Sequence, residues 1–214
     1  MIPLKDNISS RRFPVVNVVL IVINVLVFIY ELSLSQGHLT GFISIFGVVP
    51  RRVSVVPLFT AIFLHGGWIH LLGNMLYLWI FGDNVEDRLG RGRYLFLYLA
   101  AGIAGSLAQI WANPLSAEPI IGASGAIAGV LGAYFVSYPR AKVLTLLPIF
   151  FFITFVEIPA FVFLVIWFIM QFLNGFVTLG VAGNMVAWWA HIGGFVTGAL
   201  GVLILAPKRR KYIE

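Results

Sequence analysis

The sequence contains no cysteine. A disulfide framework, a thiolate metal site and a cysteine nucleophile are therefore excluded. Charged residues are also scarce, because Asp, Glu, Lys and Arg make up only 10% of the 214 residues, whereas 60% are hydrophobic. Soluble domains carry about 25% charged residues. This composition, with a mean hydropathy of +0.99, predicts a single polytopic membrane domain.

The hydrophobic residues fall into six runs separated by polar or proline-containing segments. No small-residue cleavage site follows the first run, so we expect a retained helix and not a signal peptide. The predicted fold class is an all-α polytopic membrane protein with six transmembrane helices. We expect these helices at 13–30, 68–81, 94–112, 124–138, 160–176 and 185–206.

Two apolar stretches fit none of the six helices. The segment 33–67 is too apolar for a free linker, so we expect short helices or a hairpin lying in the membrane interface. The segment 143–156 contains Pro148 and is followed by Glu157 and Pro159. We expect a loop or strand there, packed at the interface.

The charge distribution tests this layout. With six helices and both ends cytoplasmic, every Lys and Arg except Arg51 and Arg52 lies on the cytoplasmic side, as the positive-inside rule requires. The formal charge of +6 is therefore a topology signal, and we expect no nucleic-acid partner. The predicted domains are a cytoplasmic leader (1–12), a membrane domain (13–206) and a basic cytoplasmic tail (207–214).

A serine lies between two glycines where an apolar run rich in small residues begins, at Gly122-Ala123-Ser124-Gly125. The missing β-carbons let backbone or substrate approach closely. The unpaired N–H groups of a first helical turn also favour a nucleophile whose attack creates an oxyanion. Small residues at short spacing are typical of close packing between membrane helices as well. This stretch alone favours the packing interpretation, so the rest of the chain has to decide.

Polar side chains within membrane helices are costly and mark candidate functional sites. His70 and Asn74 lie four apart on one face near the start of the second helix. Ser124 and His191 lie near the starts of the fourth and sixth helices. These three helices all begin on the outer side in the predicted topology. The four residues therefore share a shallow depth, which indicates a single site.

The chemistry of such a site follows from the residue types. Ser124 needs a base, and His191 is the only histidine in the last two thirds of the chain; neutral imidazole serves as base and acid. His70, Asn74 and the Ser124 N–H can donate hydrogen bonds to an oxyanion. No carboxylate is expected at that depth. The sequence therefore predicts a Ser–His dyad that needs no metal or other cofactor.

Together these residues resemble the rhomboid intramembrane serine proteases, over about residues 15–205. The resemblance implies a six-helix rhomboid-like bundle with Ser124 as nucleophile and His191 as base. It also implies that His70 and Asn74 belong to the oxyanion hole. The motifs that carry it are His65-x4-His70-x3-Asn74, Gly122-Ala123-Ser124-Gly125, His191-x2-Gly194-x3-Gly198, Asn74-Met75 and Gly82-x2-Val85-Glu86-x3-Gly90.

Two positions differ from the family pattern. Many rhomboids carry a Trp-Arg pair in the first long loop, where this chain has Val56-Pro57. Some members also have an aromatic residue one turn after the serine that stacks on the base, where this chain has Ala128. The anchoring of the loop and the group that orients His191 are therefore left open.

Other polar residues are better explained by structure. We expect His65 to hydrogen-bond within the long loop and Glu86 to anchor the inner end of the second helix. Gln109, Gln171 and Asn174 are expected to form interhelical hydrogen bonds. A zinc site made from three of the histidines lacks the His-Glu-x-x-His pattern and a nearby carboxylate.

Three functions remain to be compared. The first is a serine endopeptidase that cuts membrane-protein substrates in or near their transmembrane helices, close to the outer face. The second is a catalytically silent relative that binds membrane proteins; such relatives usually lack the serine or the histidine. A small transporter would show internal repeats and polar groups at mid-bilayer, and neither is found. The expected partners are single-span or other transmembrane substrates and the lipid bilayer.

The compact chain indicates a prokaryotic plasma membrane. We expect the loop 178–186, with Gly180, Gly183 and Asn184, to form a mobile cap over the site.

Overall fold

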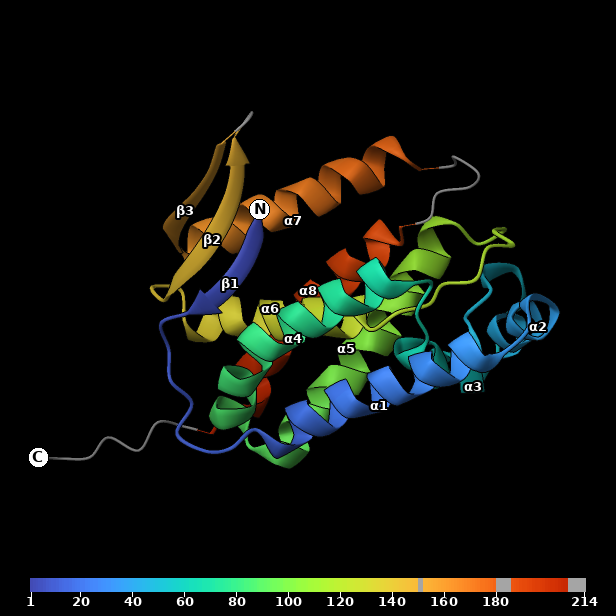
Figure 1. Ribbon diagram of the computed structural model, residues 1–214, viewed down its shortest axis with the longest axis horizontal. Helices are drawn as coiled ribbons and strands as arrows, with labels where there is room; N and C mark the ends of the chain where they lie inside the picture. Colours follow the sequence, from blue (N-terminus) through green and yellow to red (C-terminus); the bar gives the residue numbers. More distant parts are fainter. Residues whose placement is uncertain (150–151, 180–185, 208–214) are drawn as a thin grey trace, which may run out of the picture.

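The computed structural model describes residues 1–149, 152–179 and 186–207, and shows a helical bundle with one small sheet at its side (Figure 1). The long helices are α1 (Val15–Ser33), α4 (Trp68–Leu89), α5 (Arg91–Ala112), α6 (Ser124–Ser137), α7 (Ala160–Val177) and α8 (Trp188–Leu205). These helices match the six expected ranges, with ends that shift by up to eight residues.

The helices differ in how well they meet the requirements of a membrane span. In the described part of the chain, α1, α5, α7 and α8 are long and apolar enough to cross a bilayer. A fifth span is possible if α4 is joined to the segment Val55–Phe63, which meets it at a bend of 87°. With 14 residues, α6 is only about 21 Å long, which is shorter than the hydrocarbon core of about 30 Å. The chain is an integral membrane protein, and α6 is its short internal helix.

The long segment between α1 and α4 consists of short helices, as predicted. These are α2 (Gln36–Phe46), η1 (Pro50–Arg52), α3 (Val55–Thr60) and η2 (Ala61–Phe63). The Thr60 hydroxyl donates to the Phe46 carbonyl oxygen at 2.7 Å. Val48 and Ile120 exchange backbone hydrogen bonds of 3.1 and 2.7 Å, which join this segment to the stretch before α6. These bonds anchor the segment in the absence of a Trp-Arg pair.

A three-stranded antiparallel sheet contains β1 (Ile2–Asp6), β2 (Lys142–Ile149) and β3 (Phe152–Pro159), in that order. The strands β2 and β3 occupy the segment for which a loop or strand was expected. The strand β1 was not anticipated, because its partner lies far away in the sequence. The Asp6 carboxylate accepts hydrogen bonds from Tyr134 of α6 and from Asn84 of α4, and thereby fastens β1 to the bundle. Burial raises the pKa of Asp6.

Glu86 anchors the C-terminal end of α4 as a hydrogen-bonded residue, as predicted. Its two carboxylate oxygens accept hydrogen bonds from the backbone N–H groups of Val16, at 3.1 Å, and of Asn17, at 2.8 Å. These N–H groups belong to the first turn of α1, where no intrahelical acceptor exists. A carboxylate is favoured at that end of the helix dipole. The start of α1 is thus held against the end of α4.

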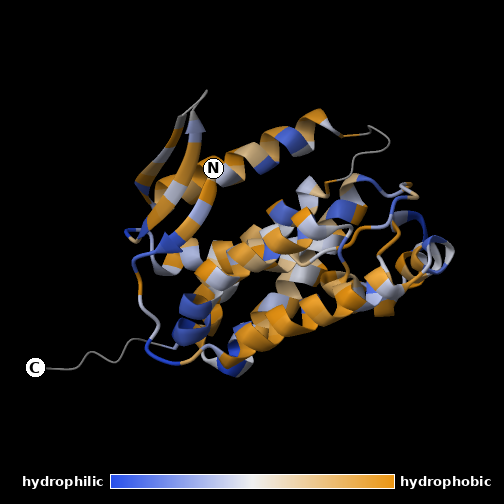
Figure 2. Ribbon diagram, viewed as in Figure 1, coloured by the Kyte–Doolittle hydropathy of each residue, from blue (hydrophilic) through white to orange (hydrophobic). Residues whose placement is uncertain are grey.

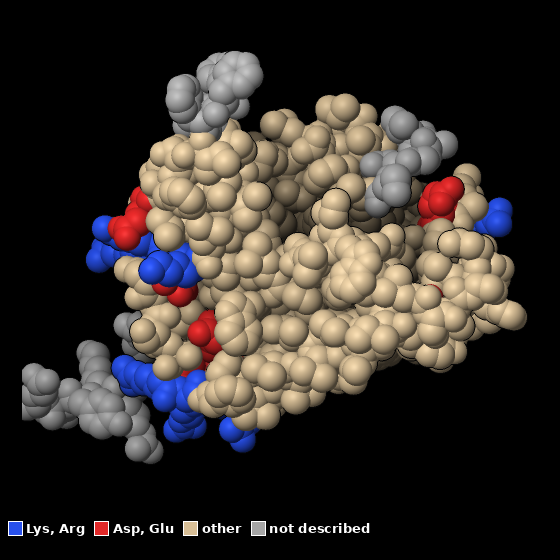
Figure 3. Space-filling view, in the orientation of Figure 1, with Lys and Arg blue, Asp and Glu red and all other residues tan. Residues whose placement is uncertain are grey.

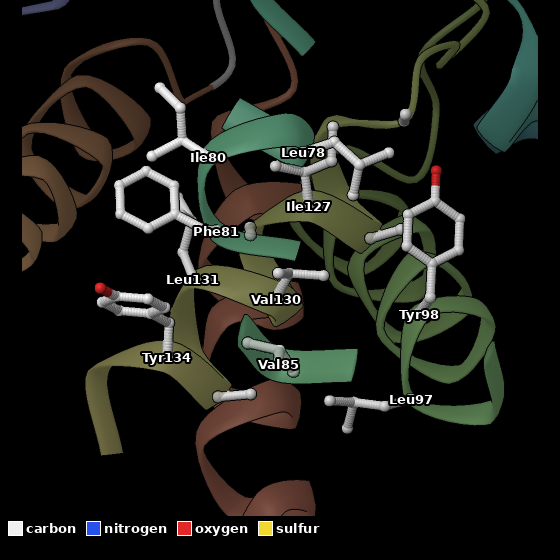
Figure 4. Close-up of a cluster of buried hydrophobic side chains, with 14 of the residues drawn as sticks. Leu78, Ile80, Phe81, Val85, Leu97, Tyr98, Ile127, Val130, Leu131 and Tyr134 are labelled. Atoms are coloured by element: carbon white, nitrogen blue, oxygen red, sulfur yellow. The ribbon is translucent and has the colours of Figure 1, made fainter. Parts of the chain in front are cut away.

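The core lies between α4, α5 and α6. Figure 4 shows apolar and aromatic side chains from these three helices pointing toward one another, among them Phe81, Val130 and Tyr134. Hydrophobic residues also cover the outer faces of the long helices (Figure 2), as expected where lipid replaces water. Most Lys and Arg of the visible face gather at its left end, a smaller charged group lies at the opposite end, and the long flank between them is almost uncharged (Figure 3).

The helices α6 and α8 approach each other through glycines. A β-carbon on Gly194 would overlap the Gly125 carbonyl, and one on Gly198 would overlap the Gly129 carbonyl. One on Gly132 would overlap the Phe195 carbonyl. Small residues allow this close approach. The packing interpretation of the small-residue run is therefore correct for α6, and the same packing sets the distance between the two helices that carry Ser124 and His191.

Candidate active site

The first half of the candidate site is built at the turn before α6. Gly122 has a φ of 118°, which glycine adopts without strain, and its N–H donates to the Ala61 carbonyl at 2.9 Å. A β-carbon at Gly122 would lie 2.6 Å from His70 Nε2 and 3.6 Å from Asn74 Nδ2. The turn that leads into Ser124 therefore lies directly against the two polar residues of α4.

The second half comes from α8. His191 Nε2 lies 2.9 Å from Ser124 Oγ, which is hydrogen-bond distance. Both side chains are partly exposed. The glycine contacts between α6 and α8 make this distance possible. The structure thus brings together Ser124, His191, His70 and Asn74, the four residues singled out from the sequence.

The environment of the His191 ring was not predicted. Gln171 of α7 lies with its Oε1 at 2.7 Å from His191 Nδ1. The ring of Trp167 lies 6.0 Å from the imidazole at an interplanar angle of 34°. The ring of Trp188 lies 6.1 Å away at 86°. The aromatic surroundings missing at Ala128 are therefore supplied by α7 and by the first turn of α8.

His65 has a structural position, as predicted. It is only 3% exposed, and its backbone N–H donates to the Glu31 carboxylate at 3.1 Å. Its Nδ1 lies 3.3 Å from the Phe63 carbonyl oxygen, and its Nε2 lies 3.0 Å from Asn74 Nδ2. Because a carbonyl only accepts, Nδ1 carries the proton and Nε2 accepts from the Asn74 amide. His65 therefore holds one N–H of Asn74, and the other has no partner among the residues that the structure describes.

His70 has the tautomer opposite to that of His65. The Gly66 N–H donates to His70 Nδ1 at 3.4 Å. An accepting Nδ1 leaves the proton on Nε2, the atom that faces Gly122. Hydrogen-bond donors from His70 and Asn74 thus point toward the turn that precedes Ser124.

Metal ligation has little support in this region. Among the described residues, no group of three His, Cys, Asp or Glu side chains is placed to hold a metal ion. His65 and His70 lie edge to face, with ring centroids 5.1 Å apart. The ring nitrogens of His191 face Ser124 and Gln171.

The expected cap at 178–186 lies for the most part outside the described residues, which leave out 180–185.

Residues 52–208 match the Rhomboid domain family. The chain belongs to the rhomboid family. Among its relatives, Rhomboid protease GluP of Bacillus subtilis is 53% identical over 76 residues, which are 36% of this chain and 14% of that protein. Rhomboid protein 1, mitochondrial, of Saccharomyces cerevisiae is 38% identical over 100 residues, 45% of this chain and 28% of that protein.

A third rhomboid relative matches a longer part of the chain. Presenilin-associated rhomboid-like protein A, mitochondrial, of Danio rerio is 30% identical over 155 residues, which are 69% of this chain and 37% of that protein. In each case less than half of the relative's own length is covered. Rhomboids are generally serine intramembrane proteases, and some members of the family are inactive.

Proposed function

We propose that this rhomboid is an active serine endopeptidase that uses Ser124 and His191 as a dyad. The observation that carries the proposal is the 2.9 Å contact between His191 Nε2 and Ser124 Oγ. A nucleophile and a base within hydrogen-bond reach, with the base oriented by a third group, are characteristic of an activated serine. The alternative is a catalytically inactive rhomboid that only binds membrane proteins, and binding alone does not require this contact.

The proposed reaction has two steps. His191 takes the proton of Ser124 Oγ as the oxygen attacks the substrate carbonyl, and then gives that proton to the leaving amine. This leaves an acyl group on Ser124. In the second step His191 deprotonates a water molecule that attacks the acyl carbonyl, and the proton returns to Ser124 as the new carboxylate leaves. The partial exposure of both side chains is consistent with entry of water.

The oxyanion formed in each step needs donors placed in advance. We assign this role to His70 Nε2, to the free N–H of Asn74 and to the backbone N–H of Ser124. Support comes from the tautomers deduced above and from the closeness of His70 and Asn74 to the turn at Gly122. No metal or other cofactor takes part in this scheme.

The substrates proposed are single-span or other transmembrane proteins, cut close to the outer face of the bilayer. Such a chain would have to unwind locally, because a helix holds its carbonyls in intrahelical bonds. We also propose a prokaryotic plasma membrane with both termini in the cytoplasm, although some relatives are mitochondrial. The proposed orientation follows the positive-inside rule.

The dyad is tested by incubating the purified protein with a panel of tagged single-span proteins. Ser124→Ala and His191→Ala should each abolish cleavage, and the double variant should be no worse than either, because the two residues act as a unit. Ser137→Ala, at the other end of α6, is the matched control and should cleave normally. A serine-directed fluorophosphonate probe should label the wild type and the Ser137→Ala variant only. Cleavage that survives in Ser124→Ala would end the proposal.

A further inference from the structure

Gln171 is a buried residue, and both the nitrogen and the oxygen of its side-chain amide have hydrogen-bond partners. It is 6% exposed and lies on α7, twenty residues before His191. Its Nε2 donates to the Trp167 carbonyl at 3.2 Å, one turn back on the same helix. Because a carbonyl cannot donate, the nitrogen of the amide must point to Trp167. The oxygen of the amide is therefore the atom that faces His191, at 2.7 Å from Nδ1.

This orientation determines which nitrogen of His191 carries the proton. An amide oxygen only accepts hydrogen bonds, so the contact requires a proton on Nδ1. In the neutral ring the proton is then absent from Nε2. An unprotonated Nε2 is the form that can accept the Ser124 hydroxyl proton. The opposite tautomer would present an N–H to Ser124 Oγ and could not serve as base.

We propose that Gln171 is a positioning residue that selects the base-competent tautomer of His191 and fixes its ring, in the place that a carboxylate takes in a catalytic triad. The inference rests on the proposed Ser124–His191 dyad. It adds a third member, contributed by α7, to a site otherwise formed by α4, α6 and α8.

The other neighbours of the ring cannot fill this role. Trp167 and Trp188 lie beside the imidazole, but an indole N–H only donates. The two rings can limit rotation of His191, but neither can accept a hydrogen bond from Nδ1–H and so favour the base-competent tautomer. A neutral amide also differs from a carboxylate, because it selects the tautomer without strongly favouring the imidazolium form. We therefore expect a smaller contribution to the rate than an aspartate gives in a triad.

The test compares variants of the full chain on a single-span substrate that the wild type cleaves. Gln171→Met keeps the length of the side chain and removes the amide. It should lower kcat by roughly 10- to 100-fold, by analogy with the loss of a partner that orients a metal-binding histidine, and leave KM within about twofold. Gln171→Glu keeps an acceptor oxygen and should recover most of the lost kcat at alkaline pH. As the pH is lowered, the kcat/KM of this variant should begin to fall at a higher pH than that of the wild type. The reason is that a carboxylate favours the imidazolium, which cannot act as a base.

Asn174→Leu is the matched control. Asn174 is an amide on the same helix and donates in the same way to a carbonyl one turn back, that of Met170, at 2.7 Å, but it is exposed and its amide bonds within its own helix. It should retain wild-type kcat. Equal losses in Gln171→Met and Gln171→Glu would show that packing matters and not the acceptor, and would overturn the inference, as would a Gln171→Met enzyme with normal kcat.

A second measurement does not depend on activity. Nitrogen-15 NMR of histidine-labelled protein, with the His191 signals assigned by their loss in His191→Ala, reports the tautomer directly. The wild type should show a protonated Nδ1, and Gln171→Met should show a mixture of both tautomers. A wild-type protein with the proton on Nε2 would refute the role of Gln171. Cleavage by Ser124→Ala would refute the dyad instead, so the two failures are distinguishable.

Discussion

Gln109 of α5 and Gln171 and Asn174 of α7 are three amide residues, and each hydrogen-bonds a different group. Gln109 Oε1 accepts from the Trp189 N–H at 3.0 Å, which joins α5 to the start of α8. Gln171 faces His191. Asn174 instead donates within its own helix. The prediction of interhelical bonds thus holds for the two glutamines, and only one of them touches the candidate base.

Asn74 is the residue whose predicted role is most directly testable. Asn74→Ala should lower turnover by roughly 10- to 1000-fold, as when one oxyanion donor is lost, and should leave substrate binding little changed. Asn84→Ala, which removes another buried amide from the same helix, is the control and should keep the wild-type turnover. The measurement is kcat and KM on one cleaved substrate. A loss confined to KM would make Asn74 a docking residue.

Single site residues can be predicted from the sequence when they belong to a characteristic motif. Residues whose role depends only on contacts in the folded structure are missed. Ser124, His191, His70 and Asn74 have characteristic spacings and a common depth, and the structure brings them together. Gln171 has neither a motif nor a distinctive spacing to His191. Its contact depends on how α7 turns against α8, which local sequence does not encode. Its available signal is that of a costly amide within a mostly apolar helix, and Asn174 of the same helix gives that signal too.

The pair α6 and α8 shows how a helix face sets the geometry of a site. Both helices are short of polar residues, and their approach depends on the absence of side chains at Gly132, Gly194 and Gly198. The distance from His191 to Ser124 is set by this contact. A substitution that separates the two helices should therefore lengthen the distance between His191 and Ser124, even when it lies far from both.

Gly198→Ala tests this dependence. Its β-carbon would overlap the backbone of Gly129, so the helices must separate. Overpacking of this kind costs about 1–3 kcal/mol of unfolding free energy, and cleavage should fall because His191 moves away from Ser124. Gly73→Ala on α4 is the control, since nothing lies within 4 Å of its β-carbon. Thermal unfolding in detergent and the cleavage rate are measured for both; a Gly198→Ala protein as stable and active as Gly73→Ala would contradict the argument.

The helices were predictable because each is specified by its own run of apolar residues. The strand β1 was not, because a five-residue segment with charged residues carries no local sign of a partner. Its pairing with β2 is decided by tertiary contacts such as those of Asp6 with Tyr134 and Asn84. The hairpin of β2 and β3 was only partly predictable, since Pro148 excluded a helix without specifying the register.

For the molecule as a whole, the sheet and the charges are independent indicators of topology. The pairing of β1 with β2 requires residues 2–6 and 142–149 to lie on the same side of the membrane. In the proposed orientation, which follows the positive-inside rule, both lie on the cytoplasmic side together with Arg88 and Arg91. The basic tail at 208–211 lies outside the described residues, so its location stays a prediction.

Reporter fusions check the orientation. A reporter inserted at Arg140 should be cytoplasmic, as should one fused after Lys211, whereas one inserted near Gly37 should be external. These locations follow from six crossings, in which the short α6 counts as one. Alkaline phosphatase and green fluorescent protein at the same sites give opposite signals and serve as mutual controls. An external reporter after Lys211 would mean a different number of crossings.

The sheet also places a condition on the order in which the protein is assembled. The side-chain oxygen of Asn7 accepts from the Lys142 N–H, 135 residues later in the chain. The strand β1 is synthesised before the four long helices that separate it from β2, and it stays unpaired until the segment after α6 has been made. The sheet is therefore completed only after α6 has been made, and a nascent chain halted before Lys142 should leave β1 accessible to a protease.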